Sequence, residues 1–227
     1  MTDNPGGSSP TVVIAAFDFD GTLTRSDSVV PFLRRFLWRW PALVGILRCA
    51  PAGLVAMARR DRDSLRLAAT SALLRGVPAV IVEQQAASFA TEIISVRLRP
   101  DTTARLRWHL SQGHRVVFVS ASYLSYLLPV ARHVGAEAVL STQLEIDDSG
   151  RCTGGLKGAN CRGPEKLARL HEWLDTQDLD RASVTIWAYG DSNGDRELLA
   201  AADHPVWVQA SLGSLSASPQ AGDQSPS

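Results

Sequence analysis

The sequence predicts an α/β fold in which a doubly wound parallel sheet carries an inserted α-helical cap and a β-hairpin. Short apolar runs without polar alternation recur along the chain, as is typical of strands buried on both faces of a parallel sheet. Helical patterns separate these runs, and this alternation favours a Rossmann-like arrangement. A long helical stretch after the first run interrupts the rhythm and predicts the cap.

The predicted elements follow one another in this order along the chain. The first strand, 11–18, reads TVVIAAFD. Residues 143–156 alternate apolar and polar side chains around Asp148-Ser149-Gly150, which predicts the hairpin. The other predicted strands are 115–120, 138–141, 184–189 and 205–209, and the predicted helices are 102–111, 122–134, 164–174 and 195–202.

This pattern divides the chain into a core, an insert and two tails. Residues 11–28 and 97–210 form the predicted core, and residues 29–96 form the predicted cap. Residues 1–10 and 211–227 are rich in small and polar side chains, a composition typical of disordered tails.

The composition excludes several classes of protein. Lys and Arg together number 23, as do Asp and Glu, and a formal net charge of zero argues against a nucleic-acid partner. Three widely spaced cysteines form neither a zinc pattern nor a disulfide framework, and the first ten residues lack a signal-peptide pattern. We therefore expect a cytoplasmic protein.

The apolar segment 36–58 allows two interpretations. Two arginines and two prolines within it argue against a membrane-spanning helix. Arginine pairs flank it and two tryptophans lie near one end, which suits peripheral contact with the inner membrane surface. The alternative is a hairpin of buried cap helices.

Two acidic clusters each follow a predicted strand directly. Asp18 and Asp20 follow the first strand, and Asp191 and Asp195 follow strand 184–189. In open α/β sheets the ligand site lies at the carboxyl ends of the strands. Carboxylates gathered there would repel one another, and burial would raise their pKa values. A hard divalent cation removes this penalty, so the sequence predicts a Mg²⁺ site.

Two further residues suit a phosphate group. Ser120 ends strand 115–120, where its hydroxyl and the backbone N–H groups of the following helix start, beginning with Ala121, can hold a phosphate oxygen. Lys166 lies in the first turn of helix 164–174, where it can neutralise phosphate charge. Lys157 and Arg162 lie nearby and remain candidates to share that role.

These motifs resemble those of the haloacid dehalogenase-like phosphohydrolase superfamily. Its four motifs appear in order as DFDGTLT at 18–24, VFVSAS at 117–122, Lys166, and GDSNGD at 190–195. The resemblance covers about residues 11–210. A helical insert between the first two motifs is similar to subgroup IB, which includes phosphoserine phosphatase and phosphatidylglycerophosphatase-type enzymes.

The resemblance implies a Mg²⁺-dependent phosphomonoester phosphatase that forms an aspartyl-phosphate. Asp18 is then the nucleophile and Asp20 the general acid and base. The alternatives are a phosphomutase or phosphotransferase of the same superfamily, and a catalytically weak, membrane-associated interaction module. The implied metal site consists of Asp18, the Asp20 carbonyl, Asp191 and, through water, Asp195, and the implied phosphate site of Ser120, Lys166 and N–H groups near Phe19, Asp20 and Ala121.

The implied substrate is a small or lipid-linked phosphate ester. Asp27 lies where phosphoserine phosphatases carry an acidic residue that reads the substrate's amine, and it is equally placed to cap a helix. Gly21 and Ala121-Ser122 depart from the phosphoserine phosphatase pattern, which argues against phosphoserine itself.

Overall fold

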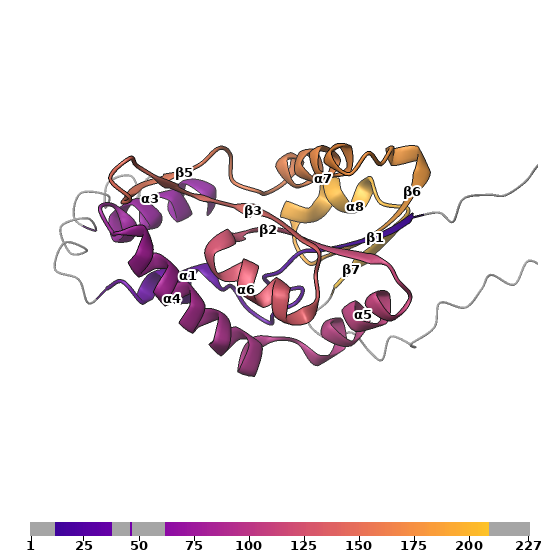
Figure 1. The fold of residues 1–227 in the computed structure, drawn as a ribbon, viewed down its shortest axis with the longest axis horizontal. Coiled ribbons are helices and arrows are strands. Elements are labelled where there is room, and N and C mark those ends of the chain that lie inside the picture. The colour runs from indigo at the N-terminus through magenta and orange to yellow at the C-terminus, as the bar shows by residue number, and fades with distance from the viewer. Residues whose placement is uncertain (1–11, 38–45, 47–61, 209–227) are drawn as a thin grey trace, which may run out of the picture.

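A five-stranded parallel sheet forms the centre of the protein (Figure 1). The computed structural model describes residues 12–37, 46 and 62–208. The strands lie in the order β3-β2-β1-β6-β7, and every neighbouring pair is parallel. The predicted α/β class and parallel sheet are therefore confirmed. The strands are β1 (Val12–Phe17), β2 (Arg115–Tyr123), β3 (Ala138–Thr142), β6 (Val184–Gly190) and β7 (His204–Trp207).

Alternate side chains of β1 enter two different hydrophobic cores, one on each face of the sheet. Ala15 and Phe17 belong to the core that includes α5 (Pro100–Ser111) and α6 (Leu124–Val134). Ile14 and Ala16 belong to the core that includes α7 (Pro164–Thr176) and α8 (Arg196–Ala200). Because both faces are covered, the strand needs no polar side chains, which explains its unbroken apolar sequence.

The helices that lie before residue 98 in the chain between β1 and β2 gather beyond one end of the sheet (Figure 1). Phe32 joins this group to the core, since its ring contacts Phe89 of the insert and Tyr123 and Tyr126 of the core. The described helices of the insert are α1 (Val29–Arg34), α3 (Arg62–Leu74), α4 (Ala79–Glu92) and the π-helical turn Ile93–Arg97.

The predicted membrane-contact segment, 36–58, lies almost entirely outside the described residues. Its contact with a membrane therefore stays a prediction. Among the residues that the structure does describe, no helix combines the length and apolarity that crossing a bilayer requires.

The predicted hairpin is present and is attached to the insert. It consists of the antiparallel strands β4 (Leu144–Ile146) and β5 (Cys152–Leu156). The backbone N–H of Cys152 donates to the Val77 carbonyl at 2.8 Å, and the N–H of Gly76 donates to the Cys152 carbonyl at 2.7 Å. The hairpin is thus bonded to the chain directly after α3, and β5 packs beside α3 at this end of the sheet.

One predicted boundary is wrong in a way that affects the site. The sequence pattern predicts a helix over 122–134, but β2 continues through Tyr123 and α6 begins at Leu124. The N–H of Ser122 donates to Ser120 Oγ at 3.2 Å, and Ser122 Oγ donates to Asp20 at 2.7 Å. These hydrogen bonds hold the chain extended for three residues beyond Ser120. The last strand and the last helix differ from the expected ranges by a few residues at their ends. The short 3₁₀ turns Arg181–Ser183 and Asn193–Asp195 were not predicted.

A fully buried histidine lies on one face of the sheet. His109 Nε2 is 2.8 Å from the Tyr189 hydroxyl, and its Nδ1 is 2.8 Å from His114 Nδ1. Burial first, and then the neighbouring His114, lowers the pKa of His109 from 6.5 to about 3. Between these two pH values the unfolded chain binds a proton that the folded chain does not.

The contribution of His109 to the free energy of unfolding is therefore expected to fall as the pH falls from about 6.5 towards 3. Replacing His109 with Gln removes this proton from the unfolded state, so H109Q should lose less stability between pH 7 and pH 4 than the parent protein. Urea unfolding at several pH values measures the slope. His133→Gln is the matched control, because it removes a histidine from an exposed position of α6. Parallel stability curves for H109Q and the parent protein would contradict the assignment.

Candidate active site

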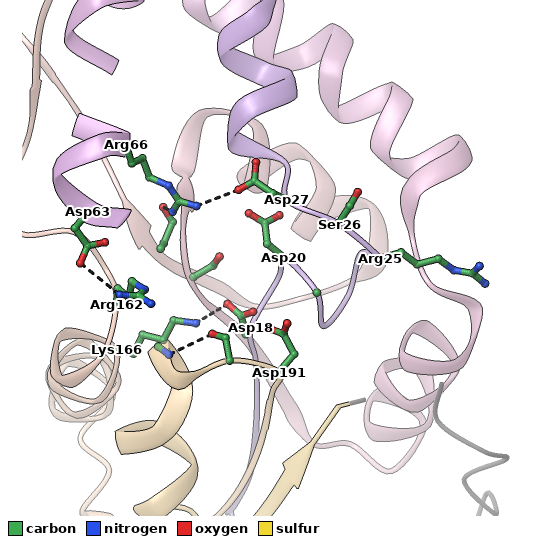
Figure 2. A pocket seen from close by; sticks show the side chains of 15 residues that line it. Asp18, Asp20, Arg25, Ser26, Asp27, Asp63, Arg66, Arg162, Lys166 and Asp191 are labelled. Carbon is green, nitrogen blue, oxygen red and sulfur yellow. Dashed lines mark hydrogen bonds and ion pairs between the residues drawn. The ribbon is translucent and has the colours of Figure 1, made fainter. Parts of the chain in front are cut away.

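A cavity of about 290 Å³ opens at the carboxyl ends of β1 and β6 (Figure 2). These strands are neighbours in the sheet, so their following loops meet there. Acidic and basic side chains from both loops, from α3 and from α7 face one another across it. The lining residues are Asp18, Asp20, Gly21, Arg25, Ser26, Asp27, Asp63, Arg66, Ser120, Ala121, Arg162, Lys166, Asp191, Ser192 and Gly194.

Lys166 lies between two buried carboxylates. Its Nζ donates to Asp18 Oδ1 and to Asp195 Oδ1, each at 2.5 Å. Burial raises the pKa of Asp18 to about 7, although the charge of Lys166 opposes that rise. Burial also works against the charge on Lys166, but the two carboxylates outweigh it and hold its pKa above the usual value. One ammonium group thus compensates carboxylates from two separate loops.

Asp195 is fixed by its own loop. Its Oδ2 accepts hydrogen bonds from the N–H and the Oγ of Ser192, at 3.0 and 2.8 Å. Gly190 makes room for it, because a Cβ atom at that position would lie 2.5 Å from Asp195 Cβ. Both carboxylate oxygens of Asp195 are therefore engaged within the protein, one by Ser192 and one by Lys166.

Three carboxylates come close enough to share one cation. Asp18, Asp191 and Asp195 each offer an oxygen, and these oxygens lie within 4.8 Å of one another. Burial, followed by the nearby Asp195, raises the pKa of Asp191. Carboxylate oxygens are the ligands that Mg²⁺ prefers, and a divalent charge would relieve the repulsion among them. The donor set therefore fits a hard divalent cation.

Asp20 lies at the same edge of the sheet but in a different environment. Its Oδ1 accepts from the N–H of Ser28 at 3.0 Å, and its Oδ2 accepts from Ser122 Oγ at 2.7 Å. The Ser28 hydroxyl also lies 2.8 Å from the Tyr126 hydroxyl. Burial, and next the charge of Asp27, raises the pKa of Asp20 to about 6. A carboxyl group with this pKa exchanges its proton readily near neutral pH.

Only some of the residues predicted to bind phosphate line the cavity. Ser120 lines the cavity and is buried, and its Oγ accepts the Ser122 N–H, which leaves its hydroxyl proton free to bind an anion. Ala121 also lines the cavity, but its N–H belongs to extended chain and not to a helix start, which corrects the expectation for this segment. The Phe19 side chain is buried in the core, and Phe19 is not among the residues that line the cavity. Lys157 does not line the cavity.

Two cavity residues on α3 were not anticipated from the sequence. Arg66 donates to Asp27 Oδ1 at 3.1 Å and to the Ala121 carbonyl at 3.2 Å. Asp63 forms an ion pair with Arg162 at 3.6 Å. Both pairs are visible in Figure 2 as bridges from the insert to the core. No local motif marks these residues, because their approach depends on how α3 packs.

Asp27 makes the cap-like contact that the sequence predicts and also lines the cavity, where its part in recognising a substrate's amine stays a prediction. One carboxylate oxygen accepts the N–H of Val30 at 2.7 Å, as a helix cap does. The other accepts from Arg66, and the residue lines the cavity.

This chain matches one protein-family model and several known proteins. The family model described as haloacid dehalogenase-like hydrolase matches residues 15–200. Protein CicA of Caulobacter vibrioides is 40% identical over 192 residues, which cover 84% of this chain and 83% of CicA. A probable phosphatase of Mycobacterium tuberculosis is 26% identical over 215 residues, which cover 92% of this chain and 73% of that protein.

Solved structures share the fold. A protein of unknown function from Bordetella pertussis superposes with a TM-score of 0.65 at 23% identity, covering 84% of this chain and 87% of the other. A substrate-bound phosphoserine phosphatase superposes with a TM-score of 0.58 at 18% identity, covering 86% and 84%. At these identities the likeness concerns the fold alone.

Gly21 is expected to be essential for the arrangement of the carboxylates. Its φ is +84°, and a Cβ atom there would lie 2.1 Å from Asp191 Oδ2. Gly21→Ala should therefore displace Asp191. If the three carboxylates hold Mg²⁺, the variant should bind it at least about tenfold more weakly, since loss of one carboxylate ligand costs a large share of the affinity. Isothermal titration with Mg²⁺ measures the change.

Gly113→Ala is the matched control for this experiment. Gly113 has a φ of +72°, and a Cβ atom at that position would meet open space within 4 Å. The substitution therefore introduces the same backbone strain, about 1–2 kcal/mol, without touching the site. Equal Mg²⁺ affinity in the Gly21 and Gly113 variants would show that the contact with Asp191 is unimportant.

Proposed function

Since the chain belongs to the haloacid dehalogenase-like hydrolase family, we propose that it is a Mg²⁺-dependent phosphatase that hydrolyses phosphomonoesters through an aspartyl-phosphate. The observation that carries this proposal is the pairing of two differently held carboxyl groups, Asp18 against Lys166 and Asp20 against two hydrogen-bond donors, in one cavity. The relative described as a probable phosphatase supports the same class of reaction.

In the first step Asp18 acts as the nucleophile. A carboxylate oxygen of Asp18 forms a bond to phosphorus while the bond from phosphorus to the ester oxygen breaks. Asp20 gives its proton to the departing alkoxide, so the alcohol leaves neutral. The hydrogen bonds from Ser28 and Ser122 orient the Asp20 carboxyl group for this transfer.

In the second step Asp20 acts as a base. It takes a proton from water, and the resulting hydroxide attacks the phosphorus of the aspartyl-phosphate. The bond from phosphorus to Asp18 breaks, which releases inorganic phosphate and restores the carboxylate. A pKa of Asp20 near 6 suits both directions of proton transfer.

Asp18 and Asp191 would hold Mg²⁺ directly, together with the backbone carbonyl of Asp20. Asp195, whose oxygens are already engaged by Ser192 and Lys166, would act through the water shell of the ion. When bound, the cation supplies positive charge that offsets the repulsion between the carboxylates and the incoming phosphate.

Lys166 and Ser120 anchor the phosphoryl group in this proposal. Lys166 is charged and faces the cavity, and the Ser120 hydroxyl can donate into it. Backbone N–H groups near Phe19, Asp20 and Ala121 add donors around the same anion. Charge developing on the phosphoryl oxygens in the transition state is thus met by fixed donors.

Asp18→Asn should reduce the turnover of p-nitrophenyl phosphate by a factor on the order of 10³ or more, because the nucleophile is lost. Asp20→Asn should also lower turnover strongly, with the larger deficit on alkyl esters, whose leaving groups need the proton. Asp175→Asn is the control, since Asp175 is exposed on α7 and lies outside the cavity. Activity of the Asp18 variant at the level of the control would refute the proposal.

Lys166→Ala should impair phosphate turnover far more than Lys157→Ala, because only Lys166 contacts the site carboxylates. Losing one member of a buried ion pair also destabilises a protein, by about 3–5 kcal/mol. Activity is therefore measured at a temperature where circular dichroism shows each variant folded. Comparable activity in both variants would overturn the role given to Lys166.

A further inference from the structure

A second cavity, of about 380 Å³, adjoins the catalytic one. Asp63 and Arg66 of α3 line both, so the two spaces share a wall. We call this space the leaving-group cavity, and its sides come from one face of α3, the end of β2 and strand β5 of the hairpin. Besides the two shared residues, its lining side chains are Ser64, Leu67, Thr70, Tyr123, Thr142, Leu156 and Asn160.

One face of α3 forms a long side of the leaving-group cavity. Asp63, Arg66, Leu67 and Thr70 follow the spacing that places side chains on the same side of a helix. Leu67 is 44% exposed and presents its side chain to this space. An apolar side chain that faces a cavity gains stability when an apolar ligand covers it.

Two polar side chains of this cavity, Thr70 and Tyr123, already form hydrogen bonds within the protein. The buried Tyr123 hydroxyl lies 2.5 Å from Thr70 Oγ1, and Thr70 Oγ1 donates to the Arg66 carbonyl at 2.7 Å. A ligand therefore meets groups there whose hydrogen bonds are made. This favours an apolar occupant over a polar one.

The two residues that line both cavities, Asp63 and Arg66, also have hydrogen-bond or ion-pair partners within the protein. Arg66 is bonded to Asp27 and to the Ala121 carbonyl, and Asp63 accepts from Asn160 Nδ2 at 2.8 Å as well as pairing with Arg162. An ionic group on the substrate would have to compete with these contacts. An uncharged chain passing along them would not.

We propose that the leaving-group cavity holds the alcohol part of the substrate, and that the substrate is a phosphomonoester whose alcohol carries an apolar, aliphatic chain. This inference rests on the proposed phosphatase function and names its substrate class. The phosphoryl group occupies the carboxylate cavity, and the chain passes Arg66 to cover Leu67 and Leu156.

A series of n-alkyl phosphates from ethyl to octyl tests the proposal, because the reacting bond stays constant while apolar area increases. The esters are used with Mg²⁺ below the concentration at which they form micelles. We expect kcat/KM to rise along the series by up to about fourfold for each methylene that becomes buried. A flat series with measurable turnover would overturn this inference and leave the phosphatase proposal standing.

Leu67→Asn and Leu65→Asn form a matched pair of variants. Both leucines lie on α3 and have nearly equal exposure, 44% and 43%, but only Leu67 lines the cavity. L67N should lower kcat/KM for octyl phosphate on the order of tenfold and leave ethyl phosphate unchanged, whereas L65N should change neither. Equal behaviour of the two variants would contradict the proposed subsite. Failure of the parent protein to hydrolyse any ester would refute the phosphatase function, and this inference with it.

Discussion

The ionic contact of Lys166 with Asp18 and Asp195 is the interaction on which the rest of the site depends. It joins three elements that are distant in sequence, the end of β1, the first turn of α7 and the turn after β6. Two carboxylates brought together without a cation would repel one another, and burial would add to the cost. The ammonium group offsets part of that penalty, although burial still raises the pKa of Asp18, and the sheet presents an acidic edge whose donor set fits a divalent cation.

In the proposed enzyme, the residues that carry out phosphate hydrolysis and those that select the substrate come from different parts of the chain. In the proposed reaction the reacting carboxyl groups follow strands of the sheet, whose register fixes them, while α3 and the hairpin line the cavity proposed for the leaving group. Arg66 and Asp63 connect the two by bridging to the core. In a family whose fold supports many substrates, we expect the residues of α3 and the hairpin to vary and the carboxylates at the strand ends to be kept.

The core could be predicted from the sequence because its signals are local. An unbroken apolar run marks β1, and acidic residues directly after β1 and β6 mark the site, since parallel strands bring their ends to one edge. The contributions of Arg66 and Asp63 could not be predicted, because they depend on the packing of a helix far along the chain. The extended course of residues 121–123 could not be predicted either, because hydrogen bonds from Ser122 to the side chains of Ser120 and Asp20 override the local helical pattern.

The most direct test of the central claim is to identify the phosphorylated residue. The Asp20→Asn variant, mixed with Mg²⁺ and p-nitrophenyl phosphate and quenched in acid, is digested and analysed by mass spectrometry. The account predicts one phosphoryl group, carried by Asp18 and formed only when Mg²⁺ is present. A phosphoryl group on another residue, or continued hydrolysis with Asp18 never modified, would contradict it.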